Sequence, residues 1–202
     1  WTSGLWAPSK KELIVKPIDW GDSAGQKNRI FSTIYHEAFH QYFFYAMGQL
    51  EAAPWFNEGY ASVLGHATVR DSKLLIQEDR EFAITLETVL KSNTGRLKRL
   101  IGLSYDEFYA KSDREKEVNY TLAWALVYYL SKGVAVEKNS PYSGILEKYT
   151  AVLWETKDAE AATTTAFEGI DLSALEKDFA KFWNSSNKRS AAERNRIVGE
   201  GK

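Results

Sequence analysis

The chain has 202 residues, of which 44% are hydrophobic and 14% aromatic, so it is long enough to bury a sizeable core within one domain. Its formal net charge of -1 shows no excess of basic residues of the kind expected for binding to nucleic acid or to an anionic membrane, so no such partner is predicted. The absence of cysteine excludes disulfides, thiolate metal sites and thiol nucleophiles, and leaves His, Asp and Glu as the strong metal ligands.

The longest strongly apolar stretch, Leu122 to Leu130, is too short to cross a bilayer. The chain also begins at Trp1 and not at a methionine followed by a signal sequence. We therefore expect a soluble piece, without membrane insertion, that has been processed or excised.

The first elements are a strand and a long helix. Residues 12 to 18 are apolar and β-branched, and Pro17 limits them to one exposed edge strand. From residue 26 to 47 apolar residues recur at spacings of three and four, which predicts a helix that is apolar nearly all round and therefore central. The polar residues inside it, among them His36, Glu37 and His40, need a separate explanation.

Helices dominate the rest of the chain. Pro54 opens a second helix over residues 55 to 69, since proline is well tolerated in a first helical turn. The pattern predicts further helices near residues 78 to 90, 105 to 111, 116 to 130, 142 to 154, 159 to 167 and 172 to 183. Residues 188 to 202 offer no apolar face and are expected to form a flexible charged tail.

The segment His36-Glu37-Ala38-Phe39-His40 is an HExxH sequence within the first helix. Four residues at 3.6 per turn bring both imidazoles to one face, about 6 Å apart, where two ring nitrogens can meet one zinc ion. Glu37 lies about 100° round the helix, so its carboxylate flanks the metal and can act as the general base. The alternative is a chance match on a surface helix.

A catalytic zinc site takes three protein ligands, so two histidines require a third donor. Glu58, early in the second helix, is the candidate, because an antiparallel return would aim it at the histidines. Its alternative is an ordinary glutamate that the dipole favours in a first helical turn. The remaining histidine, His66, is interpreted as a partly exposed helical residue outside the site.

The HExxH sequence followed by a Trp-x-Asn-Glu-Gly-aromatic-Ala segment resembles the gluzincin metallopeptidases, most visibly the aminopeptidase N family. The resemblance implies that Glu58 is the third zinc ligand. Seventeen residues separate His40 from Glu58, one fewer than is typical of that family, and the loop at residues 49 to 53 could absorb the difference.

Tyr120 begins a segment, Tyr-Thr-Leu-Ala-Trp-Ala-Leu-Val, that is similar to the helix carrying a transition-state tyrosine in gluzincins. The resemblance implies that Tyr120 donates a hydrogen bond to the oxyanion, whereas the alternative is a tyrosine that only packs in the core. Some gluzincins have an acidic residue four positions after the ligand glutamate. Ser62 occupies that place here, so the carboxylate that orients a histidine is not identified.

The whole chain resembles uncharacterised bacterial peptidase MA-like domains, and Gly4-Leu-Trp-Ala-Pro8 with residues 12 to 17 fits their opening. This implies a mainly α (α+β) zincin-like domain over residues 1 to 187. It would comprise an N-terminal strand region (1 to 25), active-site helices (26 to 70) and a helical half (71 to 187). An extracytoplasmic bacterial location is expected.

These features together predict a zinc metallopeptidase with one Zn²⁺ per chain that acts on peptide or protein substrates. The Gly-x-Met-Glu-Asn segment of aminopeptidases is absent, which favours an endopeptidase, and the strand at Leu13 to Lys16 would hold an extended peptide. Two alternatives remain open: a domain that retains zinc without turnover, and a metal-free helical binding module. No pattern predicts the oligomeric state.

Overall fold

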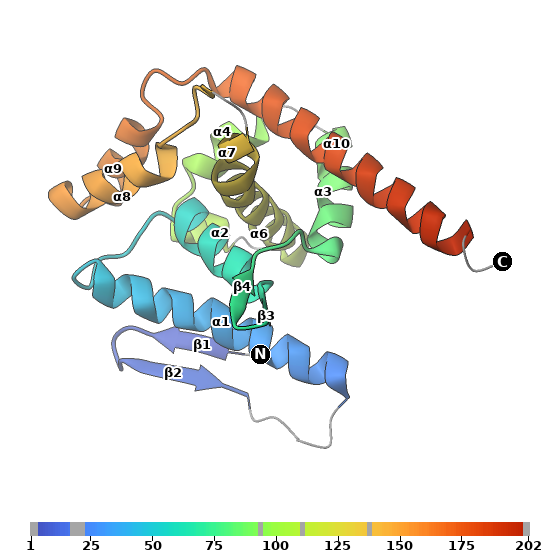
Figure 1. The fold of residues 1–202 in the computed structure, drawn as a ribbon. Coiled ribbons are helices and arrows are strands. Elements are labelled where there is room, and N and C mark those ends of the chain that lie inside the picture. Colours follow the sequence, from blue (N-terminus) through green and yellow to red (C-terminus); the bar gives the residue numbers. More distant parts are fainter. Residues whose placement is uncertain (1–3, 17–22, 93–94, 110–111, 137–138, 200–202) are drawn as a thin grey trace.

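The computed structural model describes residues 4–16, 23–92, 95–109, 112–136 and 139–199 of the chain. Within them the fold is mainly helical, with two small antiparallel sheets of two strands each (Figure 1). This confirms the mainly α fold class. Pro17, expected to limit the first strand, lies outside the described residues.

The N-terminal hairpin consists of β1 (Gly4–Ala7) and β2 (Glu12–Val15), with Leu5 opposite Ile14. The sequence predicts the second strand but not the first, because four residues bounded by Gly4 and Pro8 show no clear alternation. The hairpin packs along helix α1 (Ala24–Ala46) (Figure 1). At Gly4 the approach is so close that a Cβ would lie 2.5 Å from Cγ2 of Thr33.

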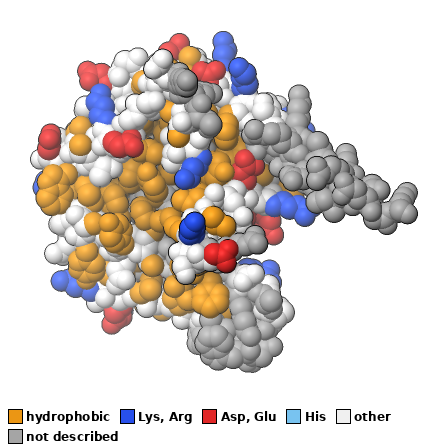
Figure 2. Space-filling view, viewed as in Figure 1, with side chains coloured by type: hydrophobic (Ala, Val, Ile, Leu, Met, Phe, Trp, Pro, Cys, Tyr) orange, Lys and Arg blue, Asp and Glu red, His pale blue; other side chains and the backbone are white. Residues whose placement is uncertain are grey.

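Helix α1 matches the predicted range of residues 26 to 47 closely, but the expectation that it is central is wrong. Phe39 and Phe43 are buried on one side, whereas Tyr42 is 69% exposed and Tyr45 is also exposed. Figure 2 shows that hydrophobic side chains lie at the surface on one face of the molecule. The tyrosines count as apolar in the helical pattern, yet their hydroxyl groups let them lie at the surface.

The buried helix is α2 (Pro54–Gly65), which packs against α1 on one side and against α6 (Asp113–Tyr128) on the other. Two glycines permit this close packing. A Cβ at Gly59 would lie 2.5 Å from Cγ2 of Val127 in α6, and a Cβ at Gly65 would lie 3.0 Å from the carbonyl oxygen of Ser32 in α1. The helix that carries Glu58 is thus fixed between two others.

Helix α2 ends at Gly65, so the expected extension to Val69 is wrong. Residues 68 to 75 form a second hairpin, β3 (Thr68–Arg70) and β4 (Lys73–Leu75). The two turn residues, Asp71 and Ser72, have φ values of 50° and 59°. Positive φ at both turn positions suits a two-residue hairpin loop, but without an Asn-Gly or Asp-Gly pair the sequence gives little sign of it.

The remaining helices follow most of the predicted ranges. They are α3 (Arg80–Ser92), α4 (Arg96–Ile101), α5 (Tyr105–Phe108), a π-helix η1 (Tyr129–Gly133), α7 (Val134–Val136), α8 (Ile145–Thr156), α9 (Ala159–Ala166) and α10 (Leu172–Gly199). Helix α4 was not expected. Helix α10 continues to Gly199, through the segment for which a flexible tail was expected.

Helix α6 lies at the centre of the helical part, with α2, α3 and α10 around it (Figure 1). Residues 121 to 130 are buried without interruption, and Trp124 packs against Trp183 of α10 with ring centroids 4.9 Å apart. No helix in the described ranges combines the length and the apolar character that crossing a membrane requires.

Candidate metal centre

His36 and His40 lie one helical turn apart on α1, and their rings meet edge to face with centroids 4.8 Å apart. The two Nε2 atoms are separated by 3.1 Å. Both side chains therefore present the same nitrogen to one point in front of the helix, as the spacing predicts.

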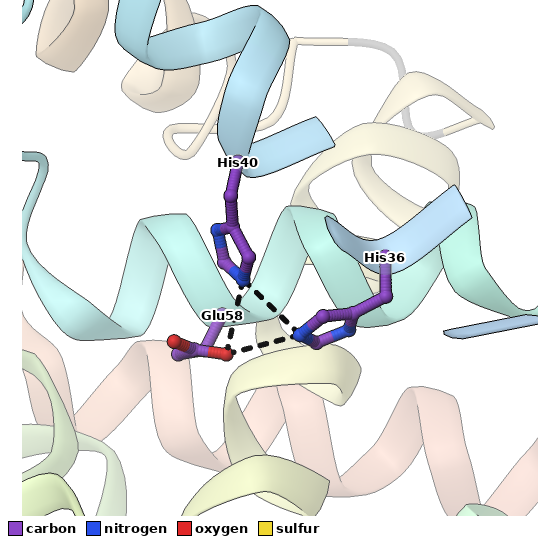
Figure 3. Close-up of side chains that lie close together, drawn as sticks. All are labelled: His36, His40 and Glu58. Carbon is purple, nitrogen blue, oxygen red and sulfur yellow. Dashed lines mark hydrogen bonds and ion pairs between the residues drawn. The ribbon is translucent and has the colours of Figure 1, made fainter. Parts of the chain in front are cut away.

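Glu58 points to this position from α2 (Figure 3). Its Oε2 lies 3.3 Å from Nε2 of His36 and 3.6 Å from Nε2 of His40. The side chain is only 3% exposed, and Oε2 has no hydrogen-bond partner in the described part of the chain. A buried carboxylate oxygen without a donor is costly, so this atom needs a positive partner.

The tautomer of His40 follows from a hydrogen-bond chain that begins at the backbone. The hydroxyl of Tyr105 donates to the carbonyl oxygen of Ala52 at 3.1 Å, so it accepts from Nδ2 of Asn57 at 2.7 Å. Oδ1 of Asn57 is then the acceptor that faces Nδ1 of His40 at 3.0 Å. Nδ1 must carry the proton, which leaves the lone pair of Nε2 directed at Glu58 and His36.

The local electrostatics keep Glu58 ionised. Burial acts to raise the pKa of the Glu58 carboxyl, but the imidazoles of His36 and His40, whose Nε2 atoms face Oε2, outweigh it and hold the pKa well below its usual range. Burial likewise acts to lower the pKa of His40, and the neighbouring Glu58 carboxylate raises it above its usual value. The site therefore holds an anion whose partners are two imidazoles.

Two imidazole nitrogens and one carboxylate oxygen, all within 4.8 Å of one another, form a ligand set suited to a metal ion. The unsatisfied Oε2 of Glu58 and the lone pair of His40 point into the same space, and a cation there would satisfy both. His36, His40 and Glu58 are thus positioned to bind a metal ion, in agreement with the prediction.

Glu37 lies next to this group without joining it. Its Oε2 accepts a hydrogen bond from the backbone N–H of Trp6 in β1 at 2.7 Å. Glu37 lines the same cleft as the three ligand residues. The carboxylate is therefore held between the metal position and the N-terminal hairpin.

Two tyrosines approach Glu58 from the opposite wall. The ring of Tyr120 lies 6.3 Å from that of His36 and 6.4 Å from that of Tyr109. The hydroxyl of Tyr109 donates to Oε1 of Glu58 at 2.7 Å. A role for Tyr120 was predicted from the sequence, whereas roles for Tyr109, Tyr105 and Asn57 were not. Of these three residues, only Asn57 could have been recognised from the sequence, because it immediately precedes the ligand glutamate.

A cleft of about 570 Å³ opens over the site, between α1, β1 and the segment from α5 to α6. Gly4, Leu5, Trp6 and Pro8 line one side, whereas no residue from 12 to 16 does. The expectation that Leu13 to Lys16 holds a peptide is therefore wrong. Strand β2 pairs with β1, and β1 faces the cleft.

Neither His66, the residue that follows α2, nor Ser62 belongs to the group of three candidate ligands. Nδ1 of His66 is 2.8 Å from the carbonyl oxygen of Ser62, and Nε2 of His66 is 3.7 Å from Oδ2 of Asp79. Asn57, an amide, supports His40 where a carboxylate was sought.

A family model for proteins of unknown function (DUF1570) matches residues 30–140. The match contains His36, His40, Glu58, Tyr109 and Tyr120, whereas the N-terminal hairpin and helices α8 to α10 lie outside it. No curated protein and no solved structure matches the chain significantly. Because the matched segment covers more than half of the chain, the protein belongs to the DUF1570 family of unknown function.

Proposed function

We propose that this protein is a zinc-dependent peptidase. The observation that carries the proposal is the convergence of His36, His40 and Glu58 around a buried, unsatisfied carboxylate oxygen, at the floor of a cleft that also contains Glu37. Two His and one carboxylate make a ligand set of catalytic zinc sites, in which a fourth position stays open to water or substrate.

A bound zinc ion would polarise the substrate carbonyl and activate a water molecule at neutral pH. Glu37 would accept the proton of the attacking water and deliver it to the leaving amine. Its hydrogen bond with the N–H of Trp6 fixes the carboxylate beside the ligands, so the base is oriented before substrate arrives.

Tyr120 would donate a hydrogen bond to the developing oxyanion. Burial, together with the charge of Glu58, raises the pKa of the Tyr120 hydroxyl, so the group stays protonated and remains a donor. Its position in the cleft wall, with its ring centroid 6.3 Å from that of His36, supports this role.

The substrate class is proposed to be internal peptide bonds. Strand β1 faces the cleft, and the N–H of Trp6 points away from β2 to Glu37, so an extended chain would lie in the cleft beside this strand. The aminopeptidase segment that binds a free amino terminus is absent from the sequence. Blocked internal peptides should therefore be cleaved at least as well as amino-terminal amides.

The buried Oε2 of Glu58 disfavours a metal-free helical module, because such a module would leave this oxygen without a hydrogen-bond donor among the described residues, with the rings of His36 and His40 beside it. The test combines two measurements on the purified chain: zinc per chain by elemental analysis, and hydrolysis of a library of blocked peptides. We expect about one zinc and detectable cleavage that stops when zinc is removed. Zinc without cleavage would favour the domain that only retains metal, and no zinc after reconstitution would refute the proposal.

A further inference from the structure

The two carboxylate oxygens of Glu58 have different surroundings. Oε2 faces the Nε2 atoms of both histidines and has no hydrogen-bond donor in the described residues. Oε1 accepts the hydroxyl proton of Tyr109 at 2.7 Å. The Glu58 side chain is almost fully buried, so the hydroxyl of Tyr109 supplies the hydrogen bond that Oε1 would accept from water at the surface.

Tyr109 is held in place for this contact. Its backbone N–H bonds to the carbonyl oxygen of Tyr105 at 3.0 Å, directly after α5. Its ring stacks on Tyr105 at a centroid distance of 5.8 Å and meets Phe108 edge to face at 5.9 Å.

We propose that Tyr109 is a positioning residue that restricts Glu58 to binding the metal through Oε2 alone. A carboxylate can bind through one oxygen or through both, and a strong donor on Oε1 favours the first mode. With one oxygen bound, the ligand set fills three positions and leaves an open one. The inference rests on the proposed metal site but not on peptide hydrolysis.

The two tyrosines near Glu58 have different proposed roles. Tyr109 acts on the ligand, so its loss should alter how the metal is held. Tyr120 is assigned to the substrate, so its loss should alter turnover. The two substitutions Tyr109→Phe and Tyr120→Phe remove the same hydroxyl group from neighbouring rings and are matched controls for each other.

The experiment measures zinc affinity by competition with a chromophoric chelator and the visible spectrum of the cobalt-substituted protein. Tyr109→Phe should weaken zinc binding about 10-fold to 100-fold, the usual effect of losing a hydrogen bond to a metal ligand. Its cobalt bands should weaken, because Oε1 is then free to bind and higher coordination lowers their intensity. Tyr60→Phe, on α2 but outside the cleft lining, should change neither quantity.

Zinc affinity within about threefold of wild type, together with an unchanged cobalt spectrum, would overturn the inference. Thermal unfolding of the metal-free variant checks that the fold is retained. The wild-type protein provides a second test: X-ray absorption or a crystal structure with zinc that shows both oxygens of Glu58 bound contradicts the inference directly. If the wild-type protein binds no metal, both this inference and the proposed function are refuted. If it binds metal but does not hydrolyse peptides, only the proposed function is refuted.

Discussion

Oδ1 of Asn57 lies 3.0 Å from Nδ1 of His40, while the next residue along the chain provides the carboxylate that faces the other nitrogen of the same ring. One turn of α2 therefore both orients a histidine ligand and supplies a ligand of its own. Because Tyr105 and Ala52 fix the direction of the amide, a backbone carbonyl determines which nitrogen of His40 is available to a metal.

Asn57→Ala is expected to weaken zinc binding about 10-fold to 100-fold, because His40 loses the acceptor that selects its tautomer. Asn57→Asp keeps an acceptor at this position and should retain most of the affinity. Tyr105→Phe, which removes only the support of the amide, should have a smaller effect than Asn57→Ala. If Asn57→Ala binds zinc as tightly as wild type in a chelator competition assay, the hydrogen-bond chain has no role in metal binding.

The variants Glu58→Ala and Glu37→Gln should distinguish the metal ligand from the general base. Loss of the Glu58 ligand is expected to reduce zinc affinity by more than the 10-fold to 100-fold typical of a lost supporting contact. Glu37→Gln should keep the metal and lose about 10² to 10⁴ in turnover. Glu51→Gln, an exposed carboxylate on the same cleft, is the control and should change neither. Equal loss of zinc in both variants would reverse the assignments.

The ligand residues could be predicted because their signal is local. His36 and His40 are related by helical spacing alone, and Glu58 follows a proline-initiated helix within a short connection. The same holds for most helices, whose apolar periodicity reflects burial in one core. In these helices the residues that give the sequence its apolar periodicity are the same residues that pack in the core.

The supporting residues could not be predicted, since their roles depend on packing between distant segments. Tyr109 reaches Glu58 across 51 positions of the chain, and Tyr105 reaches Asn57 across 48. Strand β1 was missed for a related reason: its pairing with β2 and its contact with α1 define it more than its own composition does. The exposed tyrosines of α1 misled the prediction of burial, because an amphipathic ring is compatible with either environment.

Zinc should stabilise the fold, since the ligands come from two helices that unfolding separates. At a free zinc concentration 1,000 times the dissociation constant, the gain in unfolding free energy is about 4 kcal/mol. For a chain of this size that corresponds to a rise in melting temperature of roughly 8 to 16 °C. Differential scanning calorimetry with and without a chelator measures it, and Glu58→Ala should show a much smaller rise. No zinc-dependent shift in wild type would contradict the ligand assignment.

Gly59→Ala should destabilise the protein by about 1 to 3 kcal/mol, the usual cost of overpacking. The added Cβ would meet Cγ2 of Val127 at 2.5 Å and the carbonyl oxygen of Ala123 at 2.6 Å, and the backbone atom cannot move aside without shifting α6. Gly102→Ala is the matched control, because its nearest neighbour would be 3.8 Å away. Chemical denaturation compares the two, and equal stability would mean that α2 and α6 separate easily.

Tyr120→Phe tests the assignment of the oxyanion donor. It removes the hydroxyl and keeps the ring, which packs against Phe108 at a centroid distance of 5.2 Å, so folding should be nearly unchanged. If the hydroxyl stabilises the transition state, turnover should fall about 10² to 10³ while the Michaelis constant changes little. Zinc affinity should stay close to that of wild type, in contrast to Tyr109→Phe.

The controls for this prediction are Tyr128→Phe and Tyr129→Phe, at the end of α6 and the start of η1. Both residues lie outside the cleft lining and pack against Phe182 of α10, with ring centroids 6.5 Å and 5.3 Å away. Steady-state kinetics on a blocked peptide, with zinc content measured in parallel, separates lost chemistry from lost metal. Activity of Tyr120→Phe within about threefold of wild type, a difference of less than about 1 kcal/mol in the barrier, would place Tyr120 in the core. The donor would then have to come from another residue of the cleft wall.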